Sequence, residues 1–263
     1  KEKCLCLRRL HKEQYDFVFC PFDATPKWLR RCLFFLSGKR VISHIDLQQT
    51  SRINKLRVGF RILRNPGYDW VPVIKGRSES DLNLDLLEPL LSRPSVRNLQ
   101  TFVHWESEDL SVMNLPKNYF VIQPAARNGE PTPKTWNPKN FADLVQRWRN
   151  VNPDDYFVLV GDKGDSELLK NGEIFGEGVI NLLGQTTFNQ LCNILQGAKV
   201  VIAHDSGIMH VANALQRPLL ALYGPTDYTR TAPLAPSSHI LHSKKESWAA
   251  MYAFRESEID LAK

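Results

Sequence analysis

The sequence has few cysteines and no long apolar run. Its five cysteines include no Cys-x-x-Cys pair, so neither a disulfide framework nor a zinc site is indicated. The longest apolar runs, at 32–36, 200–203 and 219–223, are far shorter than the roughly 20 residues that a membrane-spanning helix needs. These absences predict a protein of the reducing cytosol that does not cross a membrane and has no metal site.

Three motifs of common enzymes are also missing. Neither the Gly-x-Gly-x-x-Gly fingerprint of dehydrogenases nor a phosphate-binding P-loop occurs in the chain. A serine hydrolase of the α/β type needs Gly-x-Ser-x-Gly around its nucleophile, whereas the segment around Ser206 reads His-Asp-Ser-Gly-Ile. The sequence therefore argues against all three classes.

The charge balance is basic, with a formal net charge of +6 and a pI near 9.1. Such a charge favours an anionic partner, which would be nucleic acid, a phosphorylated glycolipid or the inner leaflet of a membrane. No nucleic-acid-binding module is recognisable. The basic residues are scattered, with local clusters at 8–9 and 27–31, and solvated faces account for them equally well.

From residue 119 onward, short apolar runs alternate with helical patterns. Helices are expected from Asn137-Pro138, where an N-cap precedes a proline, and at about 166–174, 187–196 and 207–215. Strands are expected at 119–124, 156–160, 179–183, 200–203 and 219–223. This alternation predicts an α/β domain whose parallel sheet has at least five strands. Ligands of such sheets bind at the carboxyl ends of the strands.

The first part of the chain has a similar but weaker pattern. Strands are expected at 15–20 and 40–43, and helices at 26–36 and 81–91. The polar stretch 106–117 precedes a new strand, so we place a domain boundary between residues 112 and 113, giving domains 1–112 and 113–263. Residues 1–10 have the pattern of the tail of a helix, and we expect the first β-α unit or units of the N-terminal domain to be missing from this sequence.

The segment after the strand at 200–203 carries the strongest chemical signal. A buried strand would deliver Asp205, Ser206 and Gly207 to the start of a helix, whose free N–H groups and partial positive charge bind phosphate. His210, one turn later, would face the same ligand. The alternative is that Asp205 or Ser206 only caps the helix while His210 packs.

Two further loops are expected at the same edge of the sheet. Gly224, Pro225 and Thr226 end the adjacent strand. The loop after the first strand, at 123–136, carries Arg127 and Lys134. A lone lysine is usually only solvated, but this one would lie beside loops that already indicate phosphate binding.

Taken in order, these motifs resemble those of the ADP-heptose:lipopolysaccharide heptosyltransferases, glycosyltransferase family 9. The resemblance covers about residues 119–226 continuously, and a looser likeness covers 15–42. The motifs that carry it are Lys134-x-Trp136-x-x-x-x-Phe141, Asn181-Leu-Leu-Gly184-x-Thr-Thr, His204-Asp205-Ser206-Gly207-x-x-His210-x-Ala212, Pro218, and Gly224-Pro225-Thr226.

The resemblance implies a GT-B architecture of two Rossmann-like domains, with an acceptor-side N-terminal domain and a donor-binding C-terminal one. It implies an inverting enzyme that uses neither metal nor cofactor and moves heptose from ADP-heptose to a lipopolysaccharide core acceptor. Lys134 would be the main cation for the leaving diphosphate, and Asp205 would contact the heptose or orient its loop. The remaining donor-site residues would be Ala126, Arg127, Asp165, Thr186, Ser206, Gly207, His210, Gly224, Pro225 and Thr226.

The chain departs from the family pattern in two places. Ser206 stands where the family often has threonine, which keeps the hydroxyl. The family's usual general base is an aspartate in a Gly-Asp turn after the first strand, and this sequence has no such segment. Asp23 is a candidate acceptor-site residue, and the base stays unassigned.

Two other functions remain open at this point. In the first, the chain has the same fold but no catalytic activity, and it serves to bind the donor or to interact with another protein. In the second, it transfers another sugar to a different glycan or to a protein. Resemblance and charge together favour a cytoplasmic enzyme that contacts the inner face of the inner membrane and an anionic glycolipid acceptor, and not nucleic acid.

Overall fold

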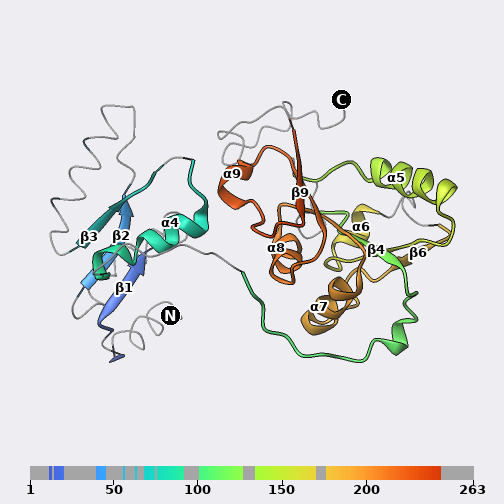
Figure 1. Ribbon diagram of the computed structural model, residues 1–263, viewed down its shortest axis with the longest axis horizontal. Coiled ribbons are helices and arrows are strands. Elements are labelled where there is room, and N and C mark those ends of the chain that lie inside the picture. The colour runs from blue at the N-terminus through green and yellow to red at the C-terminus, as the bar shows by residue number, and fades with distance from the viewer. Residues whose placement is uncertain are drawn as a thin grey trace. The chain divides into compact units, whose positions relative to one another are not determined.

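The computed structural model of the chain describes residues 12–13, 15–20, 40–45, 56, 63, 68–74, 76–91, 101–126, 134–169 and 176–243. The chain divides into two compact units, Lys1–Asn98 and Leu99–Lys263. Each is an α/β unit built on a parallel sheet (Figure 1), as the sequence predicts. None of the helices among the described residues is long and apolar enough to cross a membrane.

In the first unit, three parallel strands pair in the order β1-β2-β3. They are β1 (Phe17–Cys20), β2 (Arg40–Ile45) and β3 (Tyr68–Pro72), followed by α4 (Glu79–Asp85) and a 3-10 turn, η1 (Glu88–Leu90). β1 and β2 confirm the expected strands, whereas β3 was not predicted. The expected helix at 26–36 lies outside the described residues.

The helix expected at 81–91 is instead α4 followed by η1. It begins earlier because Ser78 is its N-cap, with a side-chain oxygen that accepts from the Asp81 amide at 3.1 Å. It ends at Asp85 because Pro89 has no N–H to donate to the Asp85 carbonyl four residues back. Leu86 then packs with Ile42 and Val71 in the small core of this unit.

The second unit contains a six-stranded parallel sheet in the order β6-β5-β4-β7-β8-β9. β4, β5 and β6 follow one another toward one edge of the sheet. The chain then returns to the middle, where β7 pairs with β4, and β8 and β9 extend the sheet toward the other edge. This is the strand order of the Rossmann fold, and β4 and β7 are the pair at which the order reverses. The strands are β4 (Tyr119–Ile122), β5 (Tyr156–Leu159), β6 (Val179–Asn181), β7 (Val201–His204), β8 (Leu219–Tyr223) and β9 (Ser238–His242).

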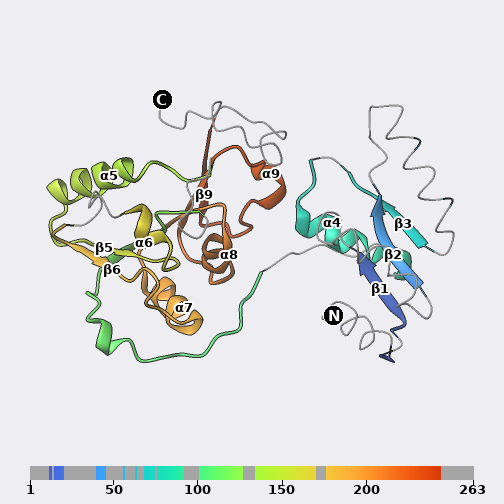
Figure 2. The ribbon, with the colours of Figure 1, turned by 180° about the vertical axis from the view of Figure 1, so that it is seen from behind.

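Helices cover both faces of this sheet (Figures 1 and 2). α5 (Pro138–Val151) and α6 (Asp165–Leu168) lie on one face, while α7 (Phe188–Gly197) and α8 (Gly207–Ala214) lie on the other. The short α9 (Tyr228–Thr231) precedes β9, and the 3-10 turn η2 (Ser111–Met113) precedes β4. α5, α7 and α8 agree with the helices expected from the sequence, while α9 and β9 were not predicted.

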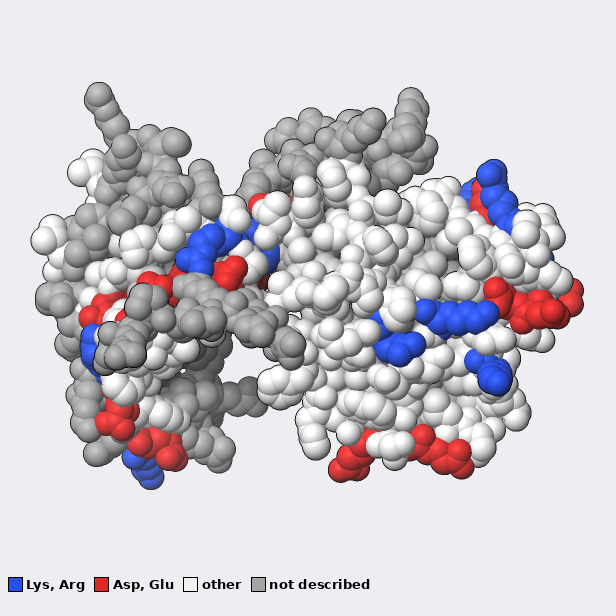
Figure 3. Space-filling view, in the orientation of Figure 1, with Lys and Arg blue, Asp and Glu red and all other residues white. Residues whose placement is uncertain are grey.

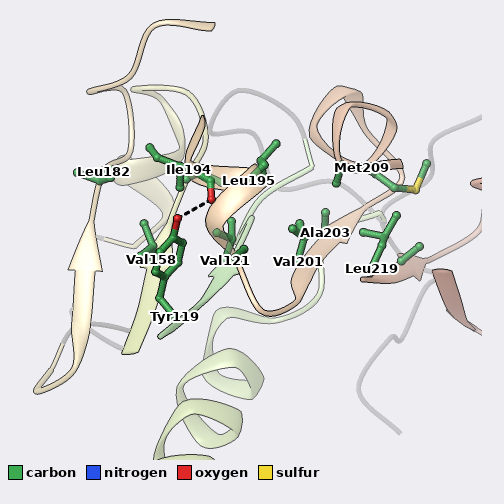
Figure 4. Packing of buried hydrophobic residues seen from close by; sticks show 14 of the residues in the cluster. Tyr119, Val121, Val158, Leu182, Ile194, Leu195, Val201, Ala203, Met209 and Leu219 are labelled. Atoms are coloured by element: carbon green, nitrogen blue, oxygen red, sulfur yellow. Dashed lines mark hydrogen bonds between the residues drawn. The ribbon is translucent and has the colours of Figure 1, made fainter. Parts of the chain in front are cut away.

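Side chains alternate between the two faces along each central strand, as the pleat requires. In β4, Tyr119 and Val121 pack toward α7 and α8, whereas Phe120 and Ile122 pack toward α5. Figure 4 shows the α7–α8 side, where the Tyr119 hydroxyl donates to the Ile194 carbonyl at 2.8 Å. Both faces of β4 are therefore buried, which accounts for its continuous apolar sequence.

The segment before β4 packs on the second unit. Leu110, Met113 and Leu115 contact its core, and the Asn213 side-chain amide donates to the Thr101 hydroxyl at 2.7 Å. Contacts therefore divide the chain at Asn98, earlier than the boundary between residues 112 and 113. The polar sequence of this segment gave no sign that its few apolar side chains belong to the second core.

Candidate functional site

A pocket of about 340 Å³ in the second unit lies at the carboxyl ends of β4 and β7. Gln123 and Ala126 follow β4, while Ser206 and Gly207 follow β7. These strands flank the reversal of strand order, where open α/β sheets usually bind their ligands. The rest of the lining consists of Gly161, Asp162, Asp165, Thr186, Thr187, Phe188, Leu191 and Ile208.

Two helices begin at this pocket, and their N-termini differ. The N-terminus of α7 is capped, because the Thr187 hydroxyl accepts from the Gln190 amide at 3.1 Å and the Gln190 side chain bonds back to the Thr187 amide. In α8, which the structure describes in full, the N-cap Ser206 makes no side-chain capping bond. Its hydroxyl instead donates to Gln123 Oε1 at 2.6 Å. The positive end of α8 thus keeps its first amides available to an anion.

Gly207 opens the approach to those amides. A Cβ placed on Gly207 would meet no atom of the described residues within 4 Å. The free space at the start of α8 therefore belongs to the pocket, and a phosphate group could come close to the backbone there.

Lys134 and Asp205 form an ion pair directly beside this helix start. Lys134 Nζ lies 2.7 Å from Asp205 Oδ2, and the side chains are 32% and 6% exposed. The Thr231 hydroxyl donates to the other carboxylate oxygen, Oδ1, at 3.3 Å. The carboxylate is thus held at both of its oxygens, and it binds the Lys134 ammonium at the residue directly before Ser206, the N-cap of α8.

The short loop that carries Lys134 is held at each of its next two residues as well. The Thr135 hydroxyl accepts from the Ala126 amide at 3.3 Å, and the Trp136 amide donates to Nε2 of His204 at 2.8 Å. His204 is fully buried at the end of β7. Burial lowers the pKa of its imidazole to about 4, with the Gln123 backbone acting weakly in the opposite direction. The ring is therefore neutral near pH 7 and able to accept this bond.

The corner between β5 and α6 forms another wall of the pocket. The buried Asp165 carboxylate accepts from the Asp162 amide at 2.8 Å, and a Cβ at Gly161 would collide with this carboxylate. Asp165 therefore shapes the corner, while the exposed Asp162 reaches the opening of the pocket. Among the described residues, no group of three or more His, Cys, Asp or Glu side chains could hold a metal ion.

Residues 84–257 match the model of glycosyltransferase family 9 (heptosyltransferase). The chain belongs to this family. The resemblance drawn from the motifs at 134–141, 181–187, 204–212 and 224–226 is thereby confirmed.

Relatives of this family 9 chain include two heptosyltransferases. Lipooligosaccharide heptosyltransferase 2 of Haemophilus influenzae is 42% identical over 164 residues, which are 60% of this chain and 46% of that protein. Lipopolysaccharide heptosyltransferase 2 of Escherichia coli K12 is 36% identical over 140 residues, 49% of this chain and 39% of that protein. The matched stretch thus spans less than half the length of either relative.

Solved structures of the family share the fold. The structure of E. coli ADP-heptose LPS heptosyltransferase II covers 93% of this chain and 74% of that one, with a TM-score of 0.60 and 20% identity. E. coli heptosyltransferase WaaC with ADP covers 93% and 71%, with a TM-score of 0.60 and 18% identity. The GT-B architecture expected for a family 9 protein is confirmed at the level of the fold.

The structure brings together only some of the residues expected at the donor site of this family 9 protein. Ala126, Asp165, Thr186, Ser206 and Gly207 line the pocket, and Lys134 and Asp205 lie beside it.

The other expected residues are not among the described residues that line this pocket. Gly224, Pro225 and Thr226 are buried at the end of β8, next to β7, and among the described residues the Thr226 hydroxyl has no hydrogen-bond partner. His210 is exposed and is not one of the described residues that line the pocket. Arg127 and Asp23 lie outside the described residues.

Sequence reasoning missed several functional candidates. Gln123 was placed where the first strand meets the loop at 123–136 but was given no role, although its side chain accepts a hydrogen bond from the Ser206 hydroxyl. Phe188 carried no signal beyond a helix pattern, and His204 stood at the start of the motif at 204–212 without a role of its own. One sequence signal would have found His204. It is a polar ring at the last position of an otherwise apolar strand, and a buried polar ring needs a hydrogen-bond partner or a place at the ligand-binding edge of the sheet.

Proposed function

We propose that this chain forms the donor side of a glycosyltransferase that moves heptose from ADP-heptose to a lipopolysaccharide core acceptor. The observation that carries the proposal is the pocket at the carboxyl ends of β4 and β7, which the open start of α8 lines. Lys134 is paired with Asp205, the residue directly before the pocket residue Ser206. An open helix start with a lysine held near it suits a diphosphate. Membership of family 9 and the names of the relatives support heptose as the sugar.

The apolar part of the pocket lining suits a nucleoside. Phe188, Leu191 and Ile208 supply apolar surface, and Phe188 is 51% exposed, so a bound base would bury part of its ring. Thr186 and Asp162 offer polar groups to a ribose at the opening. ADP as the nucleotide is supported by the solved relative that contains it, E. coli heptosyltransferase WaaC with ADP.

In the proposed reaction, the bond between the anomeric carbon and the diphosphate oxygen breaks, and its electron pair stays on that oxygen. The new negative charge would be stabilised by Lys134 and the first amides of α8, in place of a metal ion. The acceptor hydroxyl attacks the anomeric carbon from the opposite side, which inverts its configuration. Asp205 would hold Lys134 in place and contact the sugar. The group that takes the acceptor proton is not assigned.

The acceptor side is proposed from family and charge. The first unit would bind an anionic glycolipid, and the second unit would hold the donor. The net charge of +6 would favour contact with the phosphorylated core at the cytoplasmic face of the inner membrane. On the face in Figure 3, basic and acidic side chains of the second unit form small groups, some of them in contact, on a mostly uncharged surface. No single large basic area is seen on that face among the described residues.

Calorimetric titration with ADP, ADP-heptose, UDP and NAD would test the donor proposal, with Asp205→Ala as the comparison variant. We expect saturable binding of ADP that weakens in the variant. Preference for UDP would retain the site but change the sugar donor. Absence of nucleotide binding would refute the proposal and favour a silent interaction member of the fold.

A further inference from the structure

The loop at 134–136 is attached to three different parts of the site at three successive residues. The Lys134 side chain pairs with Asp205, and the Thr135 hydroxyl accepts from the Ala126 amide. The backbone amide of Trp136 donates to the His204 side chain. Of these three bonds, only the last joins the backbone of the loop to a side chain of the sheet. His204 and Asp205 are neighbours in the chain, so the end of β7 holds the loop at two points.

The surroundings of His204 limit what its ring can do. It is fully buried and packs edge-on against Phe141, with ring centroids 5.6 Å apart. Phe141 in turn packs edge-on against Trp136, with centroids 4.9 Å apart. Nε2 accepts from the Trp136 amide, so the proton of the neutral ring must be on Nδ1. The ring therefore cannot itself reach a ligand, but it fixes the Trp136 end of the loop.

We propose that His204 is a positioning residue for Lys134, because its neutral imidazole holds the Trp136 amide and so fixes the loop from which Lys134 reaches the donor diphosphate. This inference rests on the proposed function. It assigns a role to a side chain that contacts no donor atom, and it explains a buried polar ring at the end of a strand that is otherwise apolar. Without the imidazole acceptor, the amide would be buried unpaired or the loop would shift.

The rival explanation is that His204 only fills the core between β7 and α5. The two explanations differ in their consequence for Lys134. Loss of packing would lower the stability of the whole unit without acting through the lysine. Loss of positioning would weaken donor binding only as long as Lys134 is present.

The test is a double-mutant cycle on the binding of ADP, measured by calorimetry. His204→Phe keeps a ring but removes the acceptor, and His204→Gln restores an acceptor at a similar distance along the side chain. Each is combined with Lys134→Met. His44→Phe is the matched control, because His44 is also buried and hydrogen-bonded, to the Leu82 carbonyl at 2.7 Å, but lies in the first unit.

We expect His204→Phe to weaken ADP binding about tenfold, or about 1.4 kcal/mol, and to have no further effect when Lys134→Met is present. His204→Gln should recover most of the affinity, and His44→Phe should leave it unchanged. Thermal unfolding identifies variants that fail to fold, and His204→Leu replaces His204→Phe in that case.

Equal weakening in both backgrounds, or none in either, would overturn the positioning role while leaving the proposed function intact. Failure of the unsubstituted chain to bind ADP would instead refute the proposed function, and this inference with it.

Discussion

Removing the charge of Lys134 is the most direct test of the proposed chemistry. Lys134→Met keeps the unbranched stem and deletes the ammonium. Two unit charges about 4 Å apart interact by about 4 kcal/mol at an effective dielectric constant near 20. The Lys134 side chain is 32% exposed, so solvent screens part of this interaction. Loss of one preorganised stabilising group typically costs a factor of about 10² to 10³ in turnover, and we expect the lower end, about a hundredfold, or about 2.7 kcal/mol.

Lys199→Met is the matched control for this experiment. Lys199 Nζ lies 2.7 Å from Asp155 Oδ1, with side chains 41% and 12% exposed, so it makes an ion pair of the same length in the same unit. It is not one of the described residues that line the pocket. The assay follows ADP release from ADP-heptose at saturating donor and core acceptor. An unchanged turnover number in Lys134→Met, or an equal loss in both variants, would refute the role of Lys134.

Three further predictions follow from the geometry. The lowered pKa of His204 means that its contribution to stability is present above pH 6.5 and is lost as pH falls toward 4, because only the unfolded chain then takes up the proton. The free energy of unfolding should fall by up to about 1.4 kcal/mol per pH unit, roughly 3 kcal/mol in all, and a urea titration series in which His204→Gln shows the same slope would contradict this. Gly207→Ala should weaken ADP binding without loss of stability, because its Cβ enters the open space of the pocket. Gly184→Ala should instead lower the melting temperature, because Gly184 has a φ of +66° and its Cβ would lie 2.6 Å from Lys163 Cα; equal effects of the two alanines on both measurements would contradict the assignment. Phe188→Ala should weaken ADP binding by about 1 to 3 kcal/mol if a base stacks on the ring, and unchanged affinity in calorimetry would exclude that contact.

Much of the second unit could be predicted from its sequence because local and tertiary signals agree there. Asn137 before Pro138 marks the start of α5, and its side chain does accept from the Lys139 amide at 3.0 Å. Thr187 likewise caps α7. β9 was missed because its residues are only partly buried on the edge of the sheet, so its sequence lacks the continuous apolar run of β4 or β7.

The site was less predictable than the fold. Motif order placed Ser206 and Gly207 at the pocket, because a parallel strand always delivers its following loop to the same edge. The pairing of Lys134 with Asp205 depends on two side chains 71 positions apart in the chain, which no local pattern reports. His210 was expected to face the ligand from its spacing of one turn, yet the structure leaves it exposed outside the described lining of the pocket.

The reversal of strand order between β4 and β7 has a consequence for the order of synthesis. One wall of the pocket is made by described residues between Gln123 and Leu191, and the other only after β7 and the start of α8 have been added. A growing chain that stops before Val201 would have a partial sheet but only part of the proposed nucleotide site. Binding of the proposed donor would therefore begin only after β7 and α8 have been added. Because the ligand would then contact residues from both halves of the sheet, it would stabilise the folded unit against unfolding.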